Sequence, residues 1–490
     1  MSKKVVPPCQ AACPIHTDVR GYVSAIEKGD VETAIRINRL VNPLPAICGR
    51  ICTRPCEDVC RRGQVDEPIA IATLKRFAAD HTKELKIIQR PENTYNEKVA
   101  VVGGGPAGLG AAYELALLGY KVTIFEAMDK LGGMLVEGIP GFRLPKDIVE
   151  EEINIILSLG ITVKTGLSLG RDFTIEGLLK DFQSVLLALG SQKSLLPKCK
   201  GIEVSGVITA VEFLKQICRG EMPRLGKHVV IVGGGHTAID TSRTCIRMGV
   251  RDVTIIYRRT INEMPLCRAE LEEAEQEGVK VRYLAAPTEF LCDEKSNIEK
   301  VCCIEMQLGE LDESGRRRPI PVEQSEFEVK ADTVISAIGY IPDKELLKKN
   351  RIVIGDKGRI VVNETGATNI KGVFACGDVV SGPSNLTGAI ASGKKAARAV
   401  HCYFRNLSEE SETYYASGTL NENLVKLINK QNRQKMPILP IEKRINSFEE
   451  VELGFNWEQA REEAQRCLKC GTSELVKKLR SQYHSAKENI

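Results

Sequence analysis

The amino-acid sequence predicts an α/β protein in which two Rossmann-like nucleotide-binding domains are nested, next to a smaller all-α domain at the amino-terminal side. Three observations support this fold class. A strand, a glycine-rich turn, a helix and a second strand follow one another twice, at 99–127 and 228–260, as in βαβ units. Residues 1–95 have the apolar spacing of amphipathic helices and are dense in cysteine. A further strand and helix at 372–400 would complete the first nucleotide-binding domain.

Length and composition restrict the class of protein. A chain of 490 residues is expected to form two to four domains, and its 43% hydrophobic and 27% charged residues are ordinary for a globular protein. A net charge of +4 and 5% aromatic residues argue against a nucleic-acid partner. The sequence has no apolar run of eighteen residues and no signal-peptide pattern, so we expect no membrane insertion. The 17 cysteines without a secretion signal favour the cytoplasm, where thiols bind metals.

Two polar linkers, at 89–98 and 406–424, set the expected domain boundaries. They separate the all-α domain at 1–95 from the nucleotide-binding part, and that part from a carboxy-terminal extension at 406–490. Between the linkers, the chain is expected to leave the first nucleotide-binding domain near residue 215 and to return near residue 330. The first domain then comprises 96–215 and 330–405, and the inserted second domain comprises 216–329.

The first glycine-rich turn has the dinucleotide-binding pattern G-x-G-x-x-G, formed by Gly103, Gly105 and Gly108. The first glycine makes the tight turn, the second admits a pyrophosphate and the third packs the helix on the strand. Glu126 ends the second strand, where its carboxylate would accept hydrogen bonds from ribose hydroxyls. Such a pattern alone is often a simple turn, but its context here favours a site for FAD or NAD. The expected contacts include Pro106 and Ala107.

The second glycine-rich turn repeats the pattern as Gly233, Gly235 and Ala238, with His236 and Thr237 between them. When the two copies are superimposed, Glu126 falls opposite Tyr257, and Arg258 and Arg259 follow. Arginines in place of an acid offer bidentate donors to a 2′-phosphate, so this copy is predicted to bind NADP(H). The alternative is that two solvated arginines merely end a strand.

The stretch 372–400 has a strand, then Gly377 and Asp378, then a helix that begins near Thr387, Gly388 and Ala389. Backbone N–H groups at such a helix start could stabilise a reduced, anionic flavin. Two dinucleotide sites in one chain indicate that a fixed flavin exchanges hydride with a diffusible nucleotide.

Six stretches carry a resemblance to a known family, and they are GRICTRPCEDVC, GGGPAGLGAA, LGGMLVEGIPGFRLPKDIV, GGGHTAIDTSRT, VTIIYRRTINEMP and VFACGDV. The chain resembles the small (β) subunit of NADPH-dependent glutamate synthase and the matching part of dihydropyrimidine dehydrogenase. This resemblance implies FAD in the first nucleotide-binding domain, NADPH in the second, and two 4Fe–4S clusters in an amino-terminal iron–sulfur domain. By motif position it places around FAD the residues Gly103, Gly105, Gly108, Glu126, Gly133, Met134, Arg143, Gly377, Asp378 and Ala389.

The cysteines at the two ends of the chain form one divided pattern. Cys9 and Cys13-Pro read as the second half of the ferredoxin-type run that binds 4Fe–4S clusters. The family pattern begins with a further C-x2-C, whose sequence context occurs here only in EEAQRCLKCG, with Cys467 and Cys470. We therefore expect residues 455–475 to fold back and to complete the iron–sulfur domain. The alternatives for this pair are half of a zinc site or two unligated thiols.

The ligands divide into two expected sets. One cluster would take Cys9, Cys60, Cys467 and Cys470, and the other Cys13, Cys52, Cys56 and one more group. In dihydropyrimidine dehydrogenase that fourth ligand is a polar side chain, which would fall near Arg76 here. Because arginine keeps its proton, Cys48 is the natural substitute, and the fourth ligand stays open. A single four-cysteine zinc site within 48–60 would leave Cys9 and Cys13 unused.

The expected function is that of an NADPH-dependent flavin/iron–sulfur oxidoreductase similar to the glutamate synthase small subunit. It would move electrons between NADP(H), FAD and two 4Fe–4S clusters, to a partner subunit or another acceptor protein. Hydride transfer needs placement and exclusion of water rather than an acid or base, so no catalytic side chain is predicted. One alternative is the NAD(P)H-oxidising subunit of a complex linked to ferredoxin, a hydrogenase, a formate dehydrogenase or a metal reductase. The other is a non-catalytic scaffold that carries the cofactors.

Overall fold

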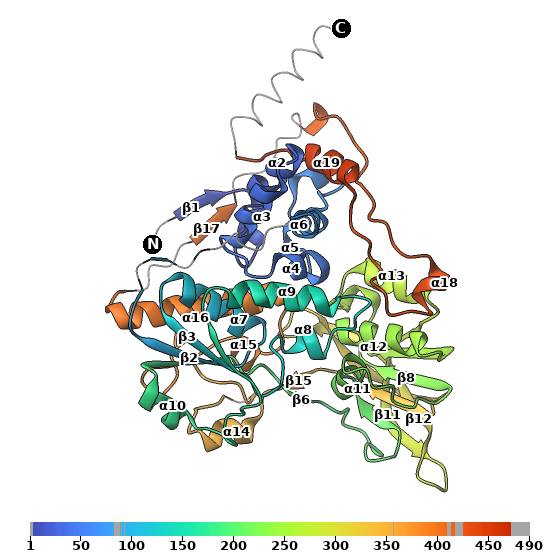
Figure 1. Cartoon of the computed structure of the whole chain (residues 1–490). Coiled ribbons are helices and arrows are strands. Elements are labelled where there is room, and N and C mark those ends of the chain that lie inside the picture. Colours follow the sequence, from blue (N-terminus) through green and yellow to red (C-terminus); the bar gives the residue numbers. More distant parts are fainter. Residues whose placement is uncertain are drawn as a thin grey trace, which may run out of the picture.

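The computed structural model describes residues 3–82, 89, 91–92, 94–355, 357–408, 413–416 and 425–471. A small helical body lies above two larger bodies, each built around a sheet (Figure 1). The helical body contains the first helices of the chain and, beside them, the last described helix. The predicted α/β class with nested parallel-sheet domains is confirmed by this arrangement.

Short helices form the amino-terminal body. They are α1 (Pro8–Ala12), α2 (Val19–Glu27), α3 (Val31–Arg39), α4 (Pro45–Ile51), α5 (Pro55–Asp58), the 3-10 helix η1 (Arg61–Gln64) and α6 (Ile71–Asp80). Asp18 and Asp30 begin α2 and α3, where each side chain accepts a hydrogen bond from a free backbone N–H. The last described helix, α19 (Trp457–Gln465), packs against α2 and α6. A parallel pair of strands, β1 (Lys3–Val6) and β17 (Thr413–Ala416), lies at the edge of this body.

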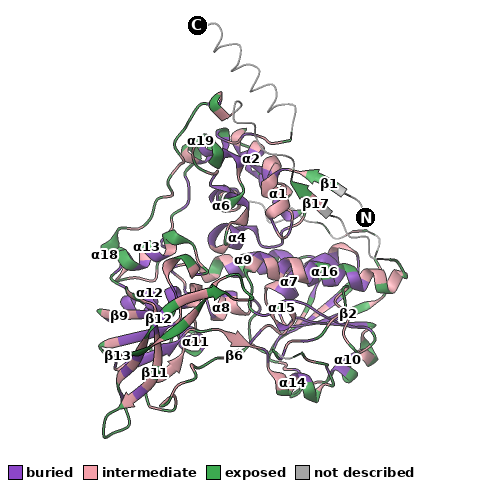
Figure 2. Ribbon diagram, turned by 180° about the vertical axis from the view of Figure 1, so that it is seen from behind, coloured by how far each residue is buried: buried purple, intermediate pink, exposed green. Residues whose placement is uncertain are grey.

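The first sheet is parallel and has the order β16-β5-β2-β3-β4. Its strands are β2 (Lys98–Val102), β3 (Lys121–Phe125), β4 (Thr162–Lys164), β5 (Ser184–Leu187) and β16 (Val373–Ala375). The associated helices are α7 (Pro106–Leu117), α8 (Met134–Glu137), α9 (Lys146–Leu157), α10 (Ile175–Asp181), α14 (Lys344–Lys349), α15 (Asp378–Ser381) and α16 (Leu386–Arg405). Helices α7 and α16 lie side by side, and α7 is largely buried whereas α16 is only partly buried (Figure 2).

The second sheet is also parallel, with the order β10-β9-β8-β14-β7. Its strands are β7 (Val207–Thr209), β8 (His228–Val232), β9 (Asp252–Tyr257), β10 (Lys280–Tyr283) and β14 (Thr333–Ser336). The helical segments beside it are α11 (Ala210–Cys218), α12 (His236–Arg247), the 3-10 helix η2 (Ile261–Glu263) and α13 (Arg268–Gln276). An antiparallel sheet follows, formed by β11 (Ala285–Cys292), β12 (Ile298–Leu311) and β13 (Arg317–Lys330).

The chain passes between the two sheet domains through a short antiparallel pair, β6 (Lys193–Ser194) and β15 (Tyr340–Ile341). Strands β7 and β14 pair with each other in the second sheet. The crossings therefore lie before residue 215 and after residue 330, which differs from the expected boundaries. The physical reason is that apolar strands of this length fit either sheet, and only hydrogen-bonded pairing assigns them.

The helical body is packed on the first sheet domain through a shared core. Cys13, Leu44 and Cys48 belong to the same buried cluster as residues of α7 and α16. At its edge Arg39 forms a buried ion pair with Glu152 of α9, with 2.6 Å between nitrogen and oxygen, and Glu152 also accepts from the Ala46 N–H. Within the described ranges, no helix has the length and apolar character needed to cross a membrane.

Candidate cofactor sites

The first glycine-rich turn is shaped to admit a ligand at its second glycine. Gly103 has φ of +109°, and a Cβ there would lie 2.3 Å from the Ala188 oxygen. A Cβ on Gly108 would lie 1.9 Å from the Gly103 oxygen, so the start of α7 needs both glycines for close packing. A Cβ on Gly105, in contrast, would meet nothing nearer than Gly133 Cα at 4.0 Å. The open space at Gly105, before the first turn of α7, fits a pyrophosphate.

Glu126 lies directly beside this turn. Its Oε2 accepts from the Gly104 N–H at 2.7 Å and its Oε1 from the Met128 N–H at 2.9 Å, and the residue is 7% exposed. The two backbone donors fix the carboxylate and leave acceptor positions for ribose hydroxyls. The local structure therefore fits the dinucleotide-binding role predicted for this residue.

The other residues predicted around FAD converge on the same end of the first sheet. Gly133 and Met134 lie at the start of α8, and a Cβ on Gly133 would be 3.1 Å from Gly105 Cα. Gly377 has φ of +73° and adjoins Ala107, because a Cβ there would lie 2.7 Å from the alanine Cβ. Asp378 follows at the start of α15, and burial raises the pKa of its carboxyl group.

Helix α16 begins beside α7, as a flavin site at its start requires. The Asn385 side chain accepts from the Gly388 N–H at 2.8 Å and so caps the turn that contains Thr387, Gly388 and Ala389. Close backbone approach holds the two helices together, since a Cβ on Gly393 would lie 2.0 Å from the Ala107 oxygen. The sequence motifs did not single out Gly393. A glycine within a long helix is the one feature that could have indicated this close contact.

Arg143 has a contact that its motif position did not indicate. Its guanidinium forms ion pairs with Asp240 of α12, at 2.9 Å, and with Glu270 of α13. Both carboxylates belong to the second sheet domain. Arg143 therefore connects the two nucleotide-binding domains, and a contact with FAD stays a prediction.

The second glycine-rich turn has the same geometry as the first. The Gly233 N–H donates to the Ile256 oxygen, just as the Gly103 N–H donates to Phe125, so Tyr257 occupies the position of Glu126. A Cβ on Gly235 would meet nothing closer than the Pro265 side chain at 3.9 Å, which leaves space for a pyrophosphate.

The turn continues into α12 in a similar way. His236, Thr237 and Ala238 form its first turn, and His236 Nδ1 lies 2.8 Å from Glu270 Oε2. Glu270 thus contacts both His236 and Arg143, and it joins the start of α12 to the first sheet domain.

The two arginines after Tyr257 have different environments. Arg258 is exposed, and the described part of the chain places no carboxylate in an ion pair with it. Arg259 is buried and forms an ion pair with Asp312 at 2.6 Å. Only Arg258 of the predicted pair is therefore left without a neutralising partner.

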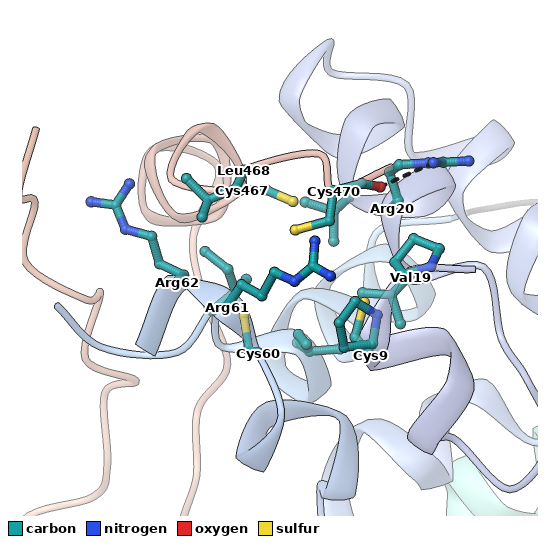
Figure 3. A pocket seen from close by; sticks show the side chains of 14 residues that line it. Cys9, Val19, Arg20, Cys60, Arg61, Arg62, Cys467, Leu468 and Cys470 are labelled. Carbon is teal, nitrogen blue, oxygen red and sulfur yellow. Dashed lines mark hydrogen bonds between the residues drawn. The ribbon is translucent and has the colours of Figure 1, made fainter. Parts of the chain in front are cut away.

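Four cysteines from distant parts of the chain surround one pocket (Figure 3). This outer cysteine group consists of Cys9, Cys60, Cys467 and Cys470. The other three thiols act electrostatically on Cys9, whose pKa is raised by burial and then by these neighbours. Burial also raises the pKa of Cys467 to about 12. Thiols so buried are poor anions by themselves, whereas a bound metal would deprotonate them.

Buried ion pairs hold the end of the chain in this position. Arg466, 1% exposed, pairs with Asp66 at 2.9 Å and with Glu463 at 2.7 Å. Glu463 in turn accepts from the Ala70 N–H at 2.8 Å. Next to the cysteines, the Arg20 guanidinium donates to the Cys470 oxygen at 3.1 Å (Figure 3). Residues 455–471 of the expected segment 455–475 lie against the amino-terminal helices, and residues 472–475 lie outside the described residues.

A second set of four cysteines lies closer to the first sheet domain. This inner cysteine group consists of Cys13, Cys48, Cys52 and Cys56. All four thiols act electrostatically on Lys75 of α6, which is 5% exposed. Arg76 instead pairs with Asp80 and with Glu450, both at 3.0 Å. The residue that faces the cysteines is therefore Lys75. No sequence motif singled it out, because a lysine in an apolar helix is usually solvated at its tip.

Each of the two groups supplies four cysteine side chains. Within the described residues, no three cysteine, histidine, aspartate or glutamate side chains could hold one metal ion. A zinc ion would need ligands about 2.3 Å from one centre. Four cysteines in each group match the four-thiolate requirement of a 4Fe–4S cluster.

Comparisons with known proteins agree with this geometry. Residues 97–393 match the pyridine nucleotide-disulphide oxidoreductase family. Residues 3–87 match the family described as dihydropyrimidine dehydrogenase domain II, 4Fe–4S cluster.

Curated relatives cover most of the chain. The NADP(+)-dependent formate dehydrogenase subunit beta of Moorella thermoacetica is 40% identical, over 95% of this chain and 71% of that one. The NADPH-Fe(3+) oxidoreductase subunit beta of Geobacter sulfurreducens is 36% identical, over 95% and 75%. The small chain of NADPH glutamate synthase from Azospirillum brasilense is 34% identical, over 82% and 88%. The solved structure of Mycobacterium tuberculosis FprA in complex with NADPH has a TM-score of 0.57 and 17% identity, covering 64% of this chain and 85% of that one, which shows a shared fold.

Proposed function

Since the chain belongs to the pyridine nucleotide-disulphide oxidoreductases and carries a 4Fe–4S domain, we propose that it is the NADP(H)-reacting subunit of a larger redox complex. The family confirms the predicted NADPH-dependent FAD/4Fe–4S oxidoreductase, and with it an enzyme rather than a scaffold. Relatives named as beta subunits or small chains imply a partner subunit for this chain.

The extent of the match favours one class of complex. The two relatives named as beta subunits of NADP(H)-linked formate dehydrogenase and NADPH-Fe(3+) oxidoreductase align over 95% of the chain. The glutamate synthase small chain aligns over 82%. The more extensive alignment with these two beta subunits supports the same role for this chain. In such a complex this subunit would react with NADP(H), and another subunit would react with a separate substrate.

The observation that carries the proposal is the order of the two cysteine groups. Cys13 and Cys48 of the inner group share a buried core with the FAD-binding domain. Cys9, Cys60 and Cys467 of the outer group pack against a different apolar cluster, which includes residues of α2, α6 and α19. Cys56 of the inner group is a buried member of this second cluster, so the inner group contacts both. The inner group therefore lies between the flavin domain and the outer group, which supports a linear path for single electrons.

The residues have distinct proposed tasks along this path. A bound FAD would supply a hydride acceptor for NADPH, and bound 4Fe–4S clusters would supply one-electron carriers. The first turn with Glu126, the α8 start and the α16 start would bind and orient FAD. The second turn with Arg258 would hold NADP(H). The inner group would ligate one cluster, with Cys48 as fourth ligand, and the outer group the other.

Iron content in matched variants tests the two-cluster assignment. Anaerobically purified chain is expected to contain about eight iron atoms. Replacing Cys467 and Cys470 by serine should lower this to about four, while NADPH still reduces the flavin. Cys292→Ser, which changes an exposed cysteine outside both groups, is the control. Unchanged iron in the double variant would contradict the outer site.

The partner requires a separate experiment. Purification of the native protein under anaerobic conditions should yield a stoichiometric second subunit with its own redox site. Reduction of that subunit by NADPH should be lost in the Cys467/Cys470 variant although dye reduction at the flavin persists. Isolation of the chain only as a monomer without any redox partner would argue against a subunit role.

A further inference from the structure

The residues around Tyr257 form a cationic group that includes more than the two arginines at the end of β9. Arg259, one of the two residues expected to bind a 2′-phosphate, already pairs with Asp312 and is 3% exposed. Its Nε also donates to the Arg317 oxygen at 2.7 Å. Both of these contacts lie at the turn between β12 and β13. Arg259 is therefore used to attach that turn to the end of β9.

Asp312 organises the turn itself. Its Oδ1 accepts from the Ser314 N–H at 2.8 Å and from the Arg316 N–H at 3.3 Å, while its Oδ2 accepts from Arg259. This arrangement is a closed Asx-type turn, which restricts where residue 316 can lie. The turn of the β12–β13 hairpin therefore places the side chain of Arg316, rather than that of Arg317 or Arg318, at the end of β9.

Arg316 is near enough to Tyr257 and Arg258 to affect both. Partial desolvation lowers the pKa of the exposed Arg258, and the positive charges of Arg259 and Arg316 lower it further. Tyr257 and Asp312 act in the opposite direction. Burial raises the pKa of Tyr257, and the same arginines oppose that rise. Among the residues that the structure describes, neither Arg258 nor Arg316 has a carboxylate ion pair, and Arg316 Nε contacts only the Ser314 hydroxyl, at 3.0 Å.

The tyrosine marks the ribose edge of the second nucleotide site. A Cβ on Gly234 would lie 2.4 Å from the Tyr257 ring, so the ring is packed on the glycine-rich turn, in the place of Glu126 in the first domain. Two arginines that have no ion-paired carboxylate among the described residues lie beside that ring and give positive charge where the ribose 2′ position would be. A phosphate dianion is the group that would neutralise it.

We propose that Arg316 binds the 2′-phosphate of NADP(H) together with Arg258, and that Arg259 and Asp312 are positioning residues that hold the turn. This inference rests on the proposed use of the second glycine-rich turn for NADP(H). It assigns the specificity for NADP(H) over NAD(H) jointly to the strand end and to a hairpin turn that starts more than fifty residues later in the chain.

Binding of 2′,5′-ADP to the holoenzyme, measured by calorimetry, tests the assignment without turnover. Arg316→Ala should weaken binding by about 10- to 100-fold, the effect of losing one charge-assisted contact. Steady-state kcat/KM should fall by a similar factor for NADPH and stay unchanged for NADH. Arg318→Ala, which removes an exposed arginine two residues away, is the matched control and should change neither value. Equal behaviour of the Arg316 and Arg318 variants would overturn the inference.

Two more variants separate this inference from the proposed function. If Arg258→Ala weakens 2′,5′-ADP binding and Arg316→Ala does not, the NADP(H) site stands and the role of Arg316 fails. If neither variant weakens binding, the second turn is not the NADP(H) site. Asp312→Asn should loosen the turn and weaken NADP⁺ binding while leaving NAD⁺ binding unchanged, and equal losses for both nucleotides would contradict the positioning role.

Discussion

At the scale of single residues, the buried lysine of the inner cysteine group is the most consequential side chain. Lys75 is 5% exposed and faces Cys13, Cys48, Cys52 and Cys56. These thiols raise its pKa against the opposing effect of burial, so it stays a cation. A fixed positive charge beside four thiolates stabilises the more negative, reduced state of a cluster.

Replacing Lys75 by methionine should therefore make the midpoint potential of the inner cluster more negative. We expect a shift on the order of 50 mV, close to the value of about 59 mV that corresponds to a tenfold change for one electron. Potentiometric titration followed by electron paramagnetic resonance measures it. Arg36→Met, an exposed cation on α3, is the control. An unchanged potential in the Lys75 variant would show that its charge does not reach the cluster.

At the scale of elements, docking of α19 decides whether the outer cysteine group exists. The helix packs its buried Ala460 and Ala464 against the helical body, and Trp457 contacts Phe77 with 5.0 Å between ring centroids. Asp66 attaches the end of α19 through Arg466. Burial raises the pKa of Asp66, but hydrogen bonds from Arg62 and the Gln431 and Glu67 N–H groups outweigh this, so the pKa lies below its usual value.

Because the pKa of Asp66 is lowered by folding, its contribution to stability is present above the unfolded value of about 3.9 and is lost as pH falls further. Asp66→Asn should release the helix, with a loss of about 3 kcal/mol, since Arg466 loses a buried partner. Fluorescence of Trp457, the only tryptophan in the chain, reports the docking, and iron content should halve. In iron-free wild-type protein the same change should occur below about pH 4.

The exposed Glu458 on the same helix provides the control, since Glu458→Gln removes a charge without a buried partner. It should keep both the fluorescence and the iron of the wild type. If Asp66→Asn behaved like this control, the ion pair would not hold the helix.

At the scale of the whole molecule, a strap formed by residues 436–456 contacts all three bodies. It includes α18 (Ile441–Arg444), and Arg444 donates to Gln276 of the second sheet domain at 3.2 Å. Glu450 pairs with Arg50 of the helical body at 2.8 Å, and the Val451 N–H donates to the Phe142 oxygen of the first sheet domain at 2.9 Å. The path of the strap from α18 to α19 is visible in Figure 1.

Phe142 is the point at which the two sheet domains and the strap meet. It is 1% exposed, its ring lies 3.8 Å from the Arg247 guanidinium carbon, and its centroid lies 6.3 Å from that of Phe448. Hydride transfer depends on how accurately the two nucleotide-binding domains are placed. A residue that holds them together should therefore affect the rate more than the binding of nucleotide.

We expect Phe142→Ala to lower the free energy of unfolding by about 3–5 kcal/mol, as for other buried phenylalanines. Flavin reduction by NADPH, followed by stopped-flow absorbance, should slow by at least about tenfold because the domains are less well placed. The Kd of 2′,5′-ADP should not change, because the ring does not touch that site. Phe142→Leu keeps most of the packing and is the control. An unaltered flavin reduction rate in the alanine variant would exclude this role.

Features that depend on residues close together in the sequence could be predicted, and contacts between residues far apart in the chain could not. The two glycine-rich turns, the acid after the first and the arginines after the second were predictable, because a strand, a turn and a helix are specified by neighbouring residues. The domain crossings and the partners of Arg143 and Arg259 were not. The crossings depend on the pairing of β7 with β14. The ion pairs of Arg143 and Arg259 depend on carboxylates from other elements of the fold.

The cysteines illustrate the difference between what the sequence predicts and what only the tertiary structure decides. Sequence patterns and the family resemblance predicted eight candidate cysteine ligands and the need for the distant pair at 467 and 470, and they left the fourth ligand of one set open. Only the tertiary structure decided that the two ends meet, that Lys75 rather than Arg76 faces the inner group, and that the β12–β13 turn lies at the end of β9. These outcomes depend on packing of surfaces far apart in the chain, which local residue patterns do not encode.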